Sequence, residues 1–364
     1  MTGDGMISSP LPYFYKMIII IGAGLSGLLT AYRLKKEGIP FKILEARTRI
    51  GGRINTLFGT DNTPVEMGAT WFGSQHKHLR ALLEELGIEY FEQYMDGTVF
   101  FQPFSTSPAE SIQIPSHPPS YRISGGTSNL INTLYQKLDE KDVVLNQSVK
   151  EIKFHNDSVQ VITDEVFEGN RVVLAIPPKL WAKKILFEPN LPDNLMSIAQ
   201  QTQTWMEDSI KIALTYKQPF WQQENLSGTL FSNTGPITEL YDHCNHKRSK
   251  YALCGFINSS FEQLAYAERR AKAIDQIKDV FGEKAEDFID YEECIWSKEE
   301  NTFEASDIAL YPHQNNGNQI FSKSFIDDKL LISSSESASE FPGYMDGAVY
   351  SANVTAKKIT TANN

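Results

Sequence analysis

The feature that most constrains this chain is a glycine-rich loop between two strand-like segments near its start. Residues 17–21 are apolar and of strand type, residues 22–27 read GAGLSG, and a helix-like segment follows to about residue 37. A second strand-like segment, residues 41–44, leads directly to Glu45. A lone GxGxxG motif is weak evidence, but strand, loop, helix, strand and terminal acid at this spacing predict a dinucleotide-binding α/β fold.

The residue types in this unit match the needs of a phosphate-bearing cofactor. Gly22 permits the tight turn, Gly24 lets the backbone approach a pyrophosphate, and Gly27 lets the helix pack closely on the strand. The first turn of the helix offers unpaired N–H donors and a partial positive charge to the phosphates. Glu45 can accept hydrogen bonds from ribose hydroxyls and would repel a 2′-phosphate, which disfavours NADP. A glycine-rich turn that binds nothing is the competing interpretation.

A second cluster of glycine and arginine follows the acid. It comprises Arg47 and then the run Arg49-Ile50-Gly51-Gly52-Arg53. A plain NAD domain does not need this cluster, whereas a second close backbone approach with arginine donors suits a longer, flavin-bearing pyrophosphate cofactor. At this point the chain resembles the FAD-dependent amine oxidase family, which includes monoamine and polyamine oxidases and L-amino-acid oxidases. In that family a double glycine follows the ribose-binding glutamate, as it does here.

Composition narrows the class of protein further. The chain has 364 residues, 41% of them hydrophobic, which is enough for a sizeable core and two domains. Its formal net charge of −11 gives no basic surface, so a nucleic-acid partner is not expected. Three cysteines without a CxxC pair indicate reduced thiols. With no apolar run of membrane-spanning length and no signal-peptide pattern, we expect a cytoplasmic protein without a membrane anchor.

The resemblance, together with nucleotide-type segments at both ends of the chain, implies an interleaved architecture. We expect a Rossmann-like FAD-binding domain with a parallel sheet, formed by residues 17–75, 140–183 and 321–364. We expect a smaller substrate domain of mixed α+β type, formed by residues 76–139 and 184–320. Residues 1–16 are then an N-terminal extension, and the Pro- and Ser-rich residues 101–120 are expected to form a loop.

Lys211 is the first candidate for a catalytic side chain. It lies in the segment 209–221, whose residues 210–216 alternate with period 2, and it points to the face opposite Ile210 and Ile212. Spacing alone favours a solvated lysine on an exposed strand face, since lysine is mostly exposed. The resemblance implies instead a lysine that reaches the flavin N5 through a water and moves protons during flavin reoxidation by oxygen.

Tyr344 is the second candidate. The run Gly343-Tyr344-Met345-Asp346-Gly347-Ala348 resembles the closing flavin motif of monoamine oxidases, in which the tyrosine forms one wall of an aromatic cage around a neutral amine. An aromatic face also attracts an amine or cationic group, by about 0.5–2 kcal/mol. A core tyrosine at the start of a helix is the competing interpretation. The second cage wall is not identifiable, because no aligned aromatic side chain lies around Ser306.

The resemblance also implies the remaining contacts to FAD. Val149 falls where a backbone contact to adenine is expected, and Trp296 matches a tryptophan near the flavin. Glu336 is expected to meet the ribityl or phosphate groups, although serines replace the family's glycine just before it. No cysteine lies between Trp296 and Tyr311, where some monoamine oxidases attach FAD covalently, so noncovalent FAD is expected. The full set of expected cofactor-binding residues is Gly22, Gly24, Leu25, Ser26, Gly27, Glu45, Ala46, Arg47, Gly52, Arg53, Gly68, Ala69, Thr70, Val149, Trp296, Glu336, Tyr344 and Met345.

Two histidine-containing clusters could be interpreted as metal-binding sites, but the spacing of their residues does not support this. They are His76-x-His78 and Asp242-His243-Cys244-x-His246. Neither has the paired ligand spacing of a structural zinc site, so no metal is expected. A hydrolase is also disfavoured, because the chain has no nucleophile-elbow motif.

The resulting hypothesis is an FAD-dependent oxidoreductase that oxidises a small-molecule amine. The resemblance implies hydride transfer to flavin N5, hydrolysis of the imine, and reoxidation of the flavin by O2 to give H2O2. Two alternatives stay open. One is a flavin-dependent desaturase or isomerase of an apolar substrate. The other is a flavin-containing accessory protein without turnover, which the short chain and the missing cage wall motivate. The sequence identifies neither the amine nor the oligomeric state.

Overall fold

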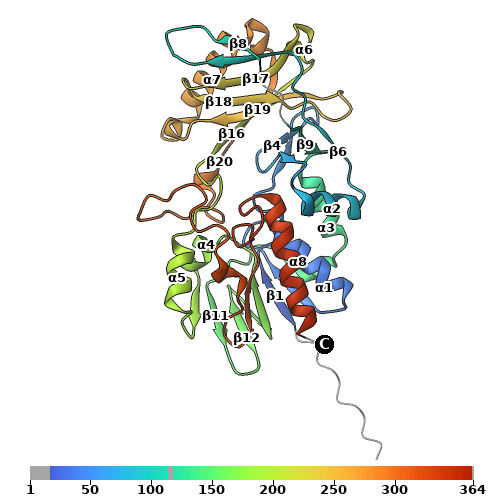
Figure 1. Ribbon diagram of the computed structural model, residues 1–364, viewed down its shortest axis with the longest axis vertical. Helices are drawn as coiled ribbons and strands as arrows, with labels where there is room; N and C mark the ends of the chain where they lie inside the picture. The colour runs from blue at the N-terminus through green and yellow to red at the C-terminus, as the bar shows by residue number, and fades with distance from the viewer. Residues whose placement is uncertain (1–16, 114–117, 363–364) are drawn as a thin grey trace, which may run out of the picture.

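The computed structural model describes residues 17–113 and 118–362. The N-terminal extension expected for residues 1–16 lies outside the described residues. Two sheets organise the chain, a parallel sheet in one half of the elongated molecule and a larger mixed sheet in the other half (Figure 1). This arrangement confirms the predicted α/β fold with a parallel sheet and a second, mixed part.

The parallel sheet is built from segments that are far apart in the sequence. Its strand order is β10-β2-β1-β14-β21, and every neighbouring pair is parallel. The strands are β1 (Ile18–Ile21), β2 (Phe41–Leu44), β10 (Val143–Val144), β14 (Arg171–Leu174) and β21 (Leu330–Ile332). β1 consists of four isoleucines that are all buried, as expected for a central strand of a sheet that is covered on both faces.

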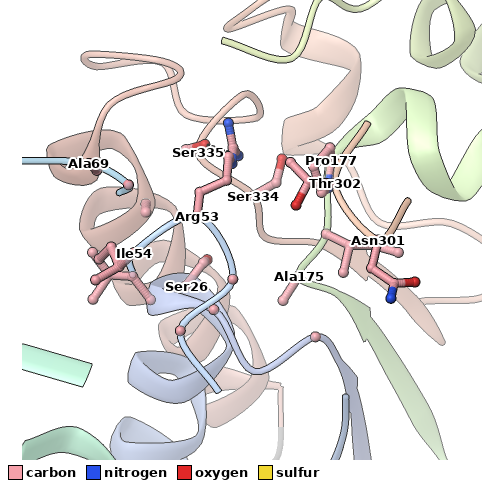
Figure 2. A pocket seen from close by; sticks show the side chains of 18 of the residues that line it. Ser26, Arg53, Ile54, Ala69, Ala175, Pro177, Asn301, Thr302, Ser334 and Ser335 are labelled. Atoms are coloured by element: carbon pink, nitrogen blue, oxygen red, sulfur yellow. Dashed lines mark hydrogen bonds between the residues drawn. The ribbon is translucent and has the colours of Figure 1, made fainter. Parts of the chain in front are cut away.

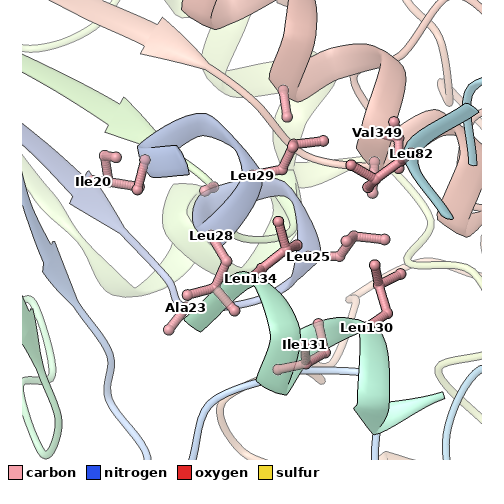
Figure 3. Close-up of a cluster of buried hydrophobic side chains, with 14 of the residues drawn as sticks. Ile20, Ala23, Leu25, Leu28, Leu29, Leu82, Leu130, Ile131, Leu134 and Val349 are labelled. Carbon is pink, nitrogen blue, oxygen red and sulfur yellow. The ribbon is translucent and has the colours of Figure 1, made fainter. Parts of the chain in front are cut away.

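Helices cover one face of the parallel sheet. They are α1 (Leu25–Lys36), α2 (Lys77–Leu86), α3 (Ser128–Gln136) and α8 (Met345–Thr361). Each helix contributes to one buried cluster, represented by Leu28, Leu82, Leu134 and Val349 (Figure 3). Because α2 and α3 pack in this core, we propose that residues 76–139, which the sequence analysis assigned to the substrate domain, belong in part to the nucleotide half.

A four-stranded sheet and two helices cover the opposite face. They are β11 (Glu151–Phe154), β12 (Val159–Ile162), β13 (Val166–Gly169), β15 (Leu186–Glu188), α4 (Pro178–Lys184) and α5 (Asp193–Gln200). Ile19 and Val172 of the parallel sheet share a buried cluster with Ile152, Trp181 and Leu195. Since β15 pairs with β11 and α5 packs on α4, we propose that the nucleotide half extends past residue 183 to the end of α5.

A seven-stranded sheet organises the other half, with the order β20-β16-β19-β18-β17-β7-β8. Its strands are β7 (Thr98–Gln102), β8 (Glu110–Ile112), β16 (Ile210–Tyr216), β17 (Leu226–Ser232), β18 (Ile237–Asp242), β19 (Tyr251–Ile257) and β20 (Phe288–Ile295). The expected loop at residues 101–120 is therefore wrong in part. Pairing with β7 outweighs the low strand propensity of the Pro- and Ser-rich sequence around β8.

The two faces of the seven-stranded sheet have different neighbours. Ile212 and Leu214 point to the face that α6 (Phe220–Gln223) and α7 (Tyr266–Phe281) cover. Ala213 and its strand neighbours point the other way and pack against Val65 and Met67, which lie in and just after β4 (Pro64–Glu66). This second face, which also carries Lys211, is thus turned toward the nucleotide half.

Short elements complete the fold. They are β3 (Thr56–Phe58), β5 (Phe72–Gly73), β6 (Tyr90–Glu92) and β9 (Ser120–Ile123). β3 pairs with β4, and β9 pairs with both β5 and β6, so the segment between the halves is held by short antiparallel ladders. Across the described ranges, no helix combines the length and the apolar character that crossing a membrane requires.

Candidate functional site

A cavity of about 410 Å³ lies where the strands of the parallel sheet end. Its lining includes Gly22 after β1, Glu45 after β2, Ala175 after β14 and Ser334 after β21. Figure 2 shows side chains from these separate segments gathered around one space. Open sheets of this kind bind ligands at the carboxyl ends of their strands. Lys211 closes the cavity from the side of the seven-stranded sheet.

The glycine loop leaves room for a pyrophosphate. Gly22 has a φ of 103°, a conformation that favours glycine. A Cβ atom at Gly27 would lie 2.0 Å from the carbonyl oxygen of Gly22, so the close approach of α1 to the loop requires glycine. A Cβ at Gly24 would meet only the Gly51 carbonyl oxygen, at 4.0 Å. It would otherwise project into open space, which fits a backbone that must approach a ligand.

Glu45 links the two glycine clusters. Its Oε2 accepts a hydrogen bond of 2.8 Å from the Ala23 N–H, and its Oε1 accepts one of 3.0 Å from the Arg47 N–H. The Arg47 guanidinium in turn donates to the Thr302 Oγ1 at 2.6 Å and to the Asn301 carbonyl at 3.2 Å. Glu45 is only 4% exposed and borders the cavity, so its carboxylate is held where a ribose could meet it.

Arg53 and Glu336 form an ion pair at the side of the cavity. The Arg53 Nη1 and Nη2 atoms donate to the two carboxylate oxygens at 2.5 and 2.9 Å, and Nη2 also donates to the Ser335 hydroxyl. Burial opposes ionisation of Glu336, but the Arg53 charge and the hydrogen bonds outweigh it and hold the pKa of this carboxyl below its ordinary value. Glu336 is fully buried and does not border the cavity, so it acts through Arg53.

The structure gathers almost all of the expected site residues around this one cavity. Apart from Gly27 and Glu336, every residue named in the sequence analysis as catalytic or cofactor-binding borders it. Gly27 instead packs α1 on the loop, as described above. Trp296 is buried and donates its Nε1–H to the Met67 carbonyl at 2.7 Å. The first turns of α1 and α8 both reach the cavity, through Ser26 and Met345, so two helix N-termini offer N–H donors there.

Lys211 is buried, contrary to what the spacing alone favoured. It is 2% exposed, and its Nζ donates to the Gly68 carbonyl and the Thr70 hydroxyl. The ammonium group also lies 4.8 Å from the ring centroid of Trp71 and 5.4 Å from that of Phe256. Burial lowers the pKa of Lys211. A lysine with a lowered pKa can release its proton more readily than a solvated one.

Tyr344 and Trp205 form an aromatic wall of the cavity. Tyr344 directly precedes α8 and is 36% exposed, which does not fit a core tyrosine. Its ring centroid lies 5.7 Å from that of Trp205 and 5.8 Å from that of His313. Trp205 stacks on His313 with centroids 3.8 Å apart. Sequence reasoning missed Trp205, because it stands in a polar stretch without periodicity.

The histidine clusters have other roles. The Nδ1 of His76 accepts a hydrogen bond from the Gly73 N–H at 3.1 Å, and burial lowers the pKa of this imidazole. His78 pairs with Glu340 on the surface. His243 is buried in the substrate half, beside Cys244. Within residues 17–113 and 118–362, no group of three or more His, Cys, Asp or Glu side chains is arranged to hold a metal ion.

The fold and the cavity define a protein that binds a dinucleotide cofactor at the ends of a parallel sheet. The family model for flavin containing amine oxidoreductases matches residues 25–120 and 103–360. The chain belongs to this family of flavin-containing amine oxidoreductases. Membership makes the protein an FAD-dependent enzyme of amine oxidase type, and it confirms the resemblance and the cofactor that the sequence predicted.

Individual relatives agree with this assignment. A probable flavin-containing monoamine oxidase A of Dictyostelium discoideum is 24% identical, over 78% of this chain and 84% of its own length. The putrescine oxidase of Kocuria rosea is also 24% identical, over 78% of this chain and 83% of its own length. A solved structure of a putrescine oxidase double mutant has a TM-score of 0.83 at 23% identity, covering 95% of this chain and 99% of that chain.

Proposed function

We propose that the protein oxidises a small-molecule amine in this cavity, with FAD bound along the glycine loop. The observation that carries the proposal is the convergence of three features on one space. These are the phosphate-accommodating loop, the buried Lys211, and the aromatic wall of Tyr344 and Trp205. Together they supply a place for the cofactor, a proton-transfer group and a surface for an amine.

The chain's own residues position the reactants and move protons. The faces of Tyr344 and Trp205 are suited to orient an amine, because aromatic rings attract amino groups. Their centroids are 5.7 Å apart, too close for a ligand between the rings, so the amine lies against the wall that they form. Lys211 holds a proton at Nζ and can pass it to a water in the cavity during reoxidation.

FAD supplies the redox chemistry when bound, accepting a hydride from the carbon next to the amine nitrogen and passing two electrons to O2, which leaves as H2O2. Hydrolysis of the imine then gives a carbonyl compound and ammonia or a smaller amine. We expect the cofactor to be noncovalent, because no cysteine is found among the described residues that border the cavity. The cysteines are free thiols, which supports the expected cytoplasmic location.

Anaerobic mixing of the FAD-loaded protein with amines, amino acids and polyamines tests the proposal. The expected result is loss of the oxidised-flavin absorbance with at least one amine, followed by its return and by H2O2 formation when oxygen is admitted. If FAD binds but no amine reduces it, amine oxidation is rejected in favour of an accessory role. If only an apolar substrate reduces it and no peroxide forms, desaturation or isomerisation replaces the proposal.

A further inference from the structure

His76 is a buried histidine that borders the cofactor cavity. It directly precedes α2 and is 7% exposed. Its Nδ1 accepts the Gly73 N–H at 3.1 Å, so Nδ1 carries no proton and the proton of the neutral ring lies on Nε2. Burial lowers the pKa of this imidazole, which favours the neutral ring at physiological pH. His76 therefore has an N–H donor at Nε2.

This Nε2 donor has no acceptor in the protein. Among the residues that the structure describes, none accepts a hydrogen bond from the Nε2 of His76. By contrast, the buried side-chain donors of Lys211 and Trp296 at the same cavity both have protein acceptors. Leaving a buried donor without an acceptor is costly. We therefore expect a group that occupies the cavity to accept the hydrogen bond.

The His76 ring is held in place beside the start of α8. Its centroid lies 4.7 Å from that of Phe341, at an interplanar angle of 87°, and 5.6 Å from that of Tyr344. The two neighbouring helices are linked, because Asp346 in the first turn of α8 accepts the Leu79 N–H of α2 at 2.7 Å. The position of the donor relative to α8 is thus fixed by packing on both helices.

The start of α8 is a place where negative charge on a bound flavin is favoured. Tyr344 and Met345, at the start of this helix, border the cavity. A helix N-terminus carries a partial positive charge. Reduced flavin holds its negative charge at N1 and the C2 carbonyl, so this end of the ring system is stabilised near the α8 N-terminus. An N–H donor at the same place adds to that stabilisation as the charge develops.

We propose that His76 donates a hydrogen bond from Nε2 to the N1–C2 carbonyl end of the bound flavin and thereby stabilises the reduced, anionic flavin. This inference rests on the proposed function only in placing FAD in this cavity. Because the donor belongs to a neutral ring, its contribution comes from a hydrogen bond and not from a full positive charge. The bond strengthens on reduction, since a charged acceptor binds a donor more tightly than a neutral one does.

Sulfite is the probe for this contact, because it tests the flavin of the FAD-loaded protein without any amine. The sulfur lone pair forms a bond to flavin N5, and an electron pair of the ring moves to N1 and the C2 carbonyl, where the negative charge then lies. His76→Asn keeps an acceptor for the Gly73 N–H and suits the position before a helix, but it removes the Nε2 donor. We expect the dissociation constant of sulfite to rise about fivefold to tenfold in this variant, and the reduction potential of the flavin, measured by dye equilibration, to fall.

Two further variants locate the effect. His76→Gln places an amide N–H near the position of Nε2 and loses the acceptor at Nδ1, so its sulfite affinity should stay within about twofold of wild type. His78→Asn changes the neighbouring surface histidine of α2, which pairs with Glu340, and it should bind sulfite like wild type. Wild-type sulfite affinity in His76→Asn, or an equal loss of affinity in His76→Gln, would overturn the inference.

Nuclear magnetic resonance of the unaltered protein tests the same contact if the variants fail to fold. With isotope-labelled histidine, we expect the Nε2–H signal of a neutral imidazole to shift when sulfite binds to the FAD-loaded protein. If no histidine signal shifts, the inference is wrong. None of these measurements uses an amine, so failure of the proposed function is recognised separately, as a flavin that binds sulfite but is reduced by no amine.

Discussion

Arg53 and Glu336 form a bidentate ion pair although 283 positions separate them in the chain. Arg53 ends the second glycine cluster, which follows β2, whereas Glu336 follows β21 at the edge of the parallel sheet. The Arg53 guanidinium also borders the cavity. The ion pair therefore links the segment that follows β21 to the loop that forms one wall of the cofactor site.

Replacing Glu336 by Gln is expected to destabilise the protein in a pH-dependent way. The pKa of Glu336 in the folded protein lies below its ordinary value of 4.5, so its ionised form contributes stability above that pH. The contribution is lost as the pH falls through the lowered pKa of the folded state. At neutral pH we expect the free energy of unfolding to fall by about 1.5–3 kcal/mol, the range for hydrogen bonds to a charged group.

Denaturant unfolding of wild type and Glu336→Gln, measured from neutral pH into acid, checks this. The difference in the free energy of unfolding between wild type and Glu336→Gln should be constant near neutrality. It should become smaller below about pH 4.5, the ordinary pKa of glutamate. Glu168→Gln, in an exposed position, serves as the control and should have the same free energy of unfolding as wild type. If the difference in free energy of unfolding between wild type and Glu336→Gln persists unchanged into strong acid, the ion pair is not the cause of that difference.

Two glycines at the start of α1, Gly24 and Gly27, are expected to respond differently to replacement by alanine. In Gly24→Ala the new methyl group projects into open space, so stability without FAD should stay within about 0.5 kcal/mol of wild type. The affinity for FAD should fall at least tenfold, because the methyl group takes the place of the pyrophosphate. In Gly27→Ala the methyl group meets the Gly22 carbonyl, and overpacking should cost about 1–3 kcal/mol or more of stability.

Thermal unfolding without FAD and flavin-fluorescence titration separate these two effects. The two variants control for each other, since the same methyl group is added three positions apart, at Gly24 just before α1 and at Gly27 in its first turn. If Gly24→Ala binds FAD as tightly as wild type does, the pyrophosphate lies elsewhere and the role assigned to the loop is wrong.

Lys211→Met is expected to slow reoxidation of the flavin while FAD stays bound. The substitution removes the proton-carrying Nζ but keeps an unbranched side chain in a fully buried position. We expect the second-order rate of reoxidation by oxygen to fall on the order of 10²-fold, the usual scale for loss of a proton-transfer group. Stopped-flow mixing of reduced enzyme with oxygen measures it. Lys217→Met, at an exposed position after β16, should react like wild type, and unchanged kinetics in Lys211→Met would remove Lys211 from the mechanism.

Trp205→Ala is expected to weaken amine binding without affecting FAD content. Losing an aromatic face costs about 0.5–2 kcal/mol, so KM for the amine should rise between about twofold and thirtyfold. Trp205→Phe keeps a ring against Tyr344 and should recover most of the loss. Steady-state kinetics with the best amine measures both variants. A KM in Trp205→Ala equal to that of wild type would mean that the amine does not contact this wall.

The nucleotide unit could be predicted because its determinants are local in sequence. Strand, glycine loop, helix and Glu45 follow one another within thirty residues, and each step has a strong residue preference. The ends of β1 and β2 then bring Gly24 and Glu45 to one edge of the sheet without further information. The resemblance to the amine oxidase family added Lys211 and Tyr344 to the predicted site. The spacing alone predicted neither that Lys211 is buried nor that Tyr344 is partly exposed.

The rest of the site depends on pairing between distant segments. The position of Lys211 beside Phe256 of β19 exists only through the register of the two strands, which the sequence of either strand alone does not encode. Trp205 reaches Tyr344 from a loop with no periodic pattern. Our proposal that α2 and α3 belong to the nucleotide half also depends on such packing, since both helices join its core through tertiary contacts rather than through any local motif.

The edge position of β21 has a consequence for synthesis of the protein. Because residues Leu330–Ile332 form this strand, the sheet stays incomplete until the chain has been synthesised, and has left the ribosome, beyond these residues. Until then β14 presents an open, strongly apolar edge that invites pairing with other chains. A prematurely terminated product would keep that edge and lack Glu336, so we expect it to aggregate or to be degraded rather than to accumulate as a partly active enzyme.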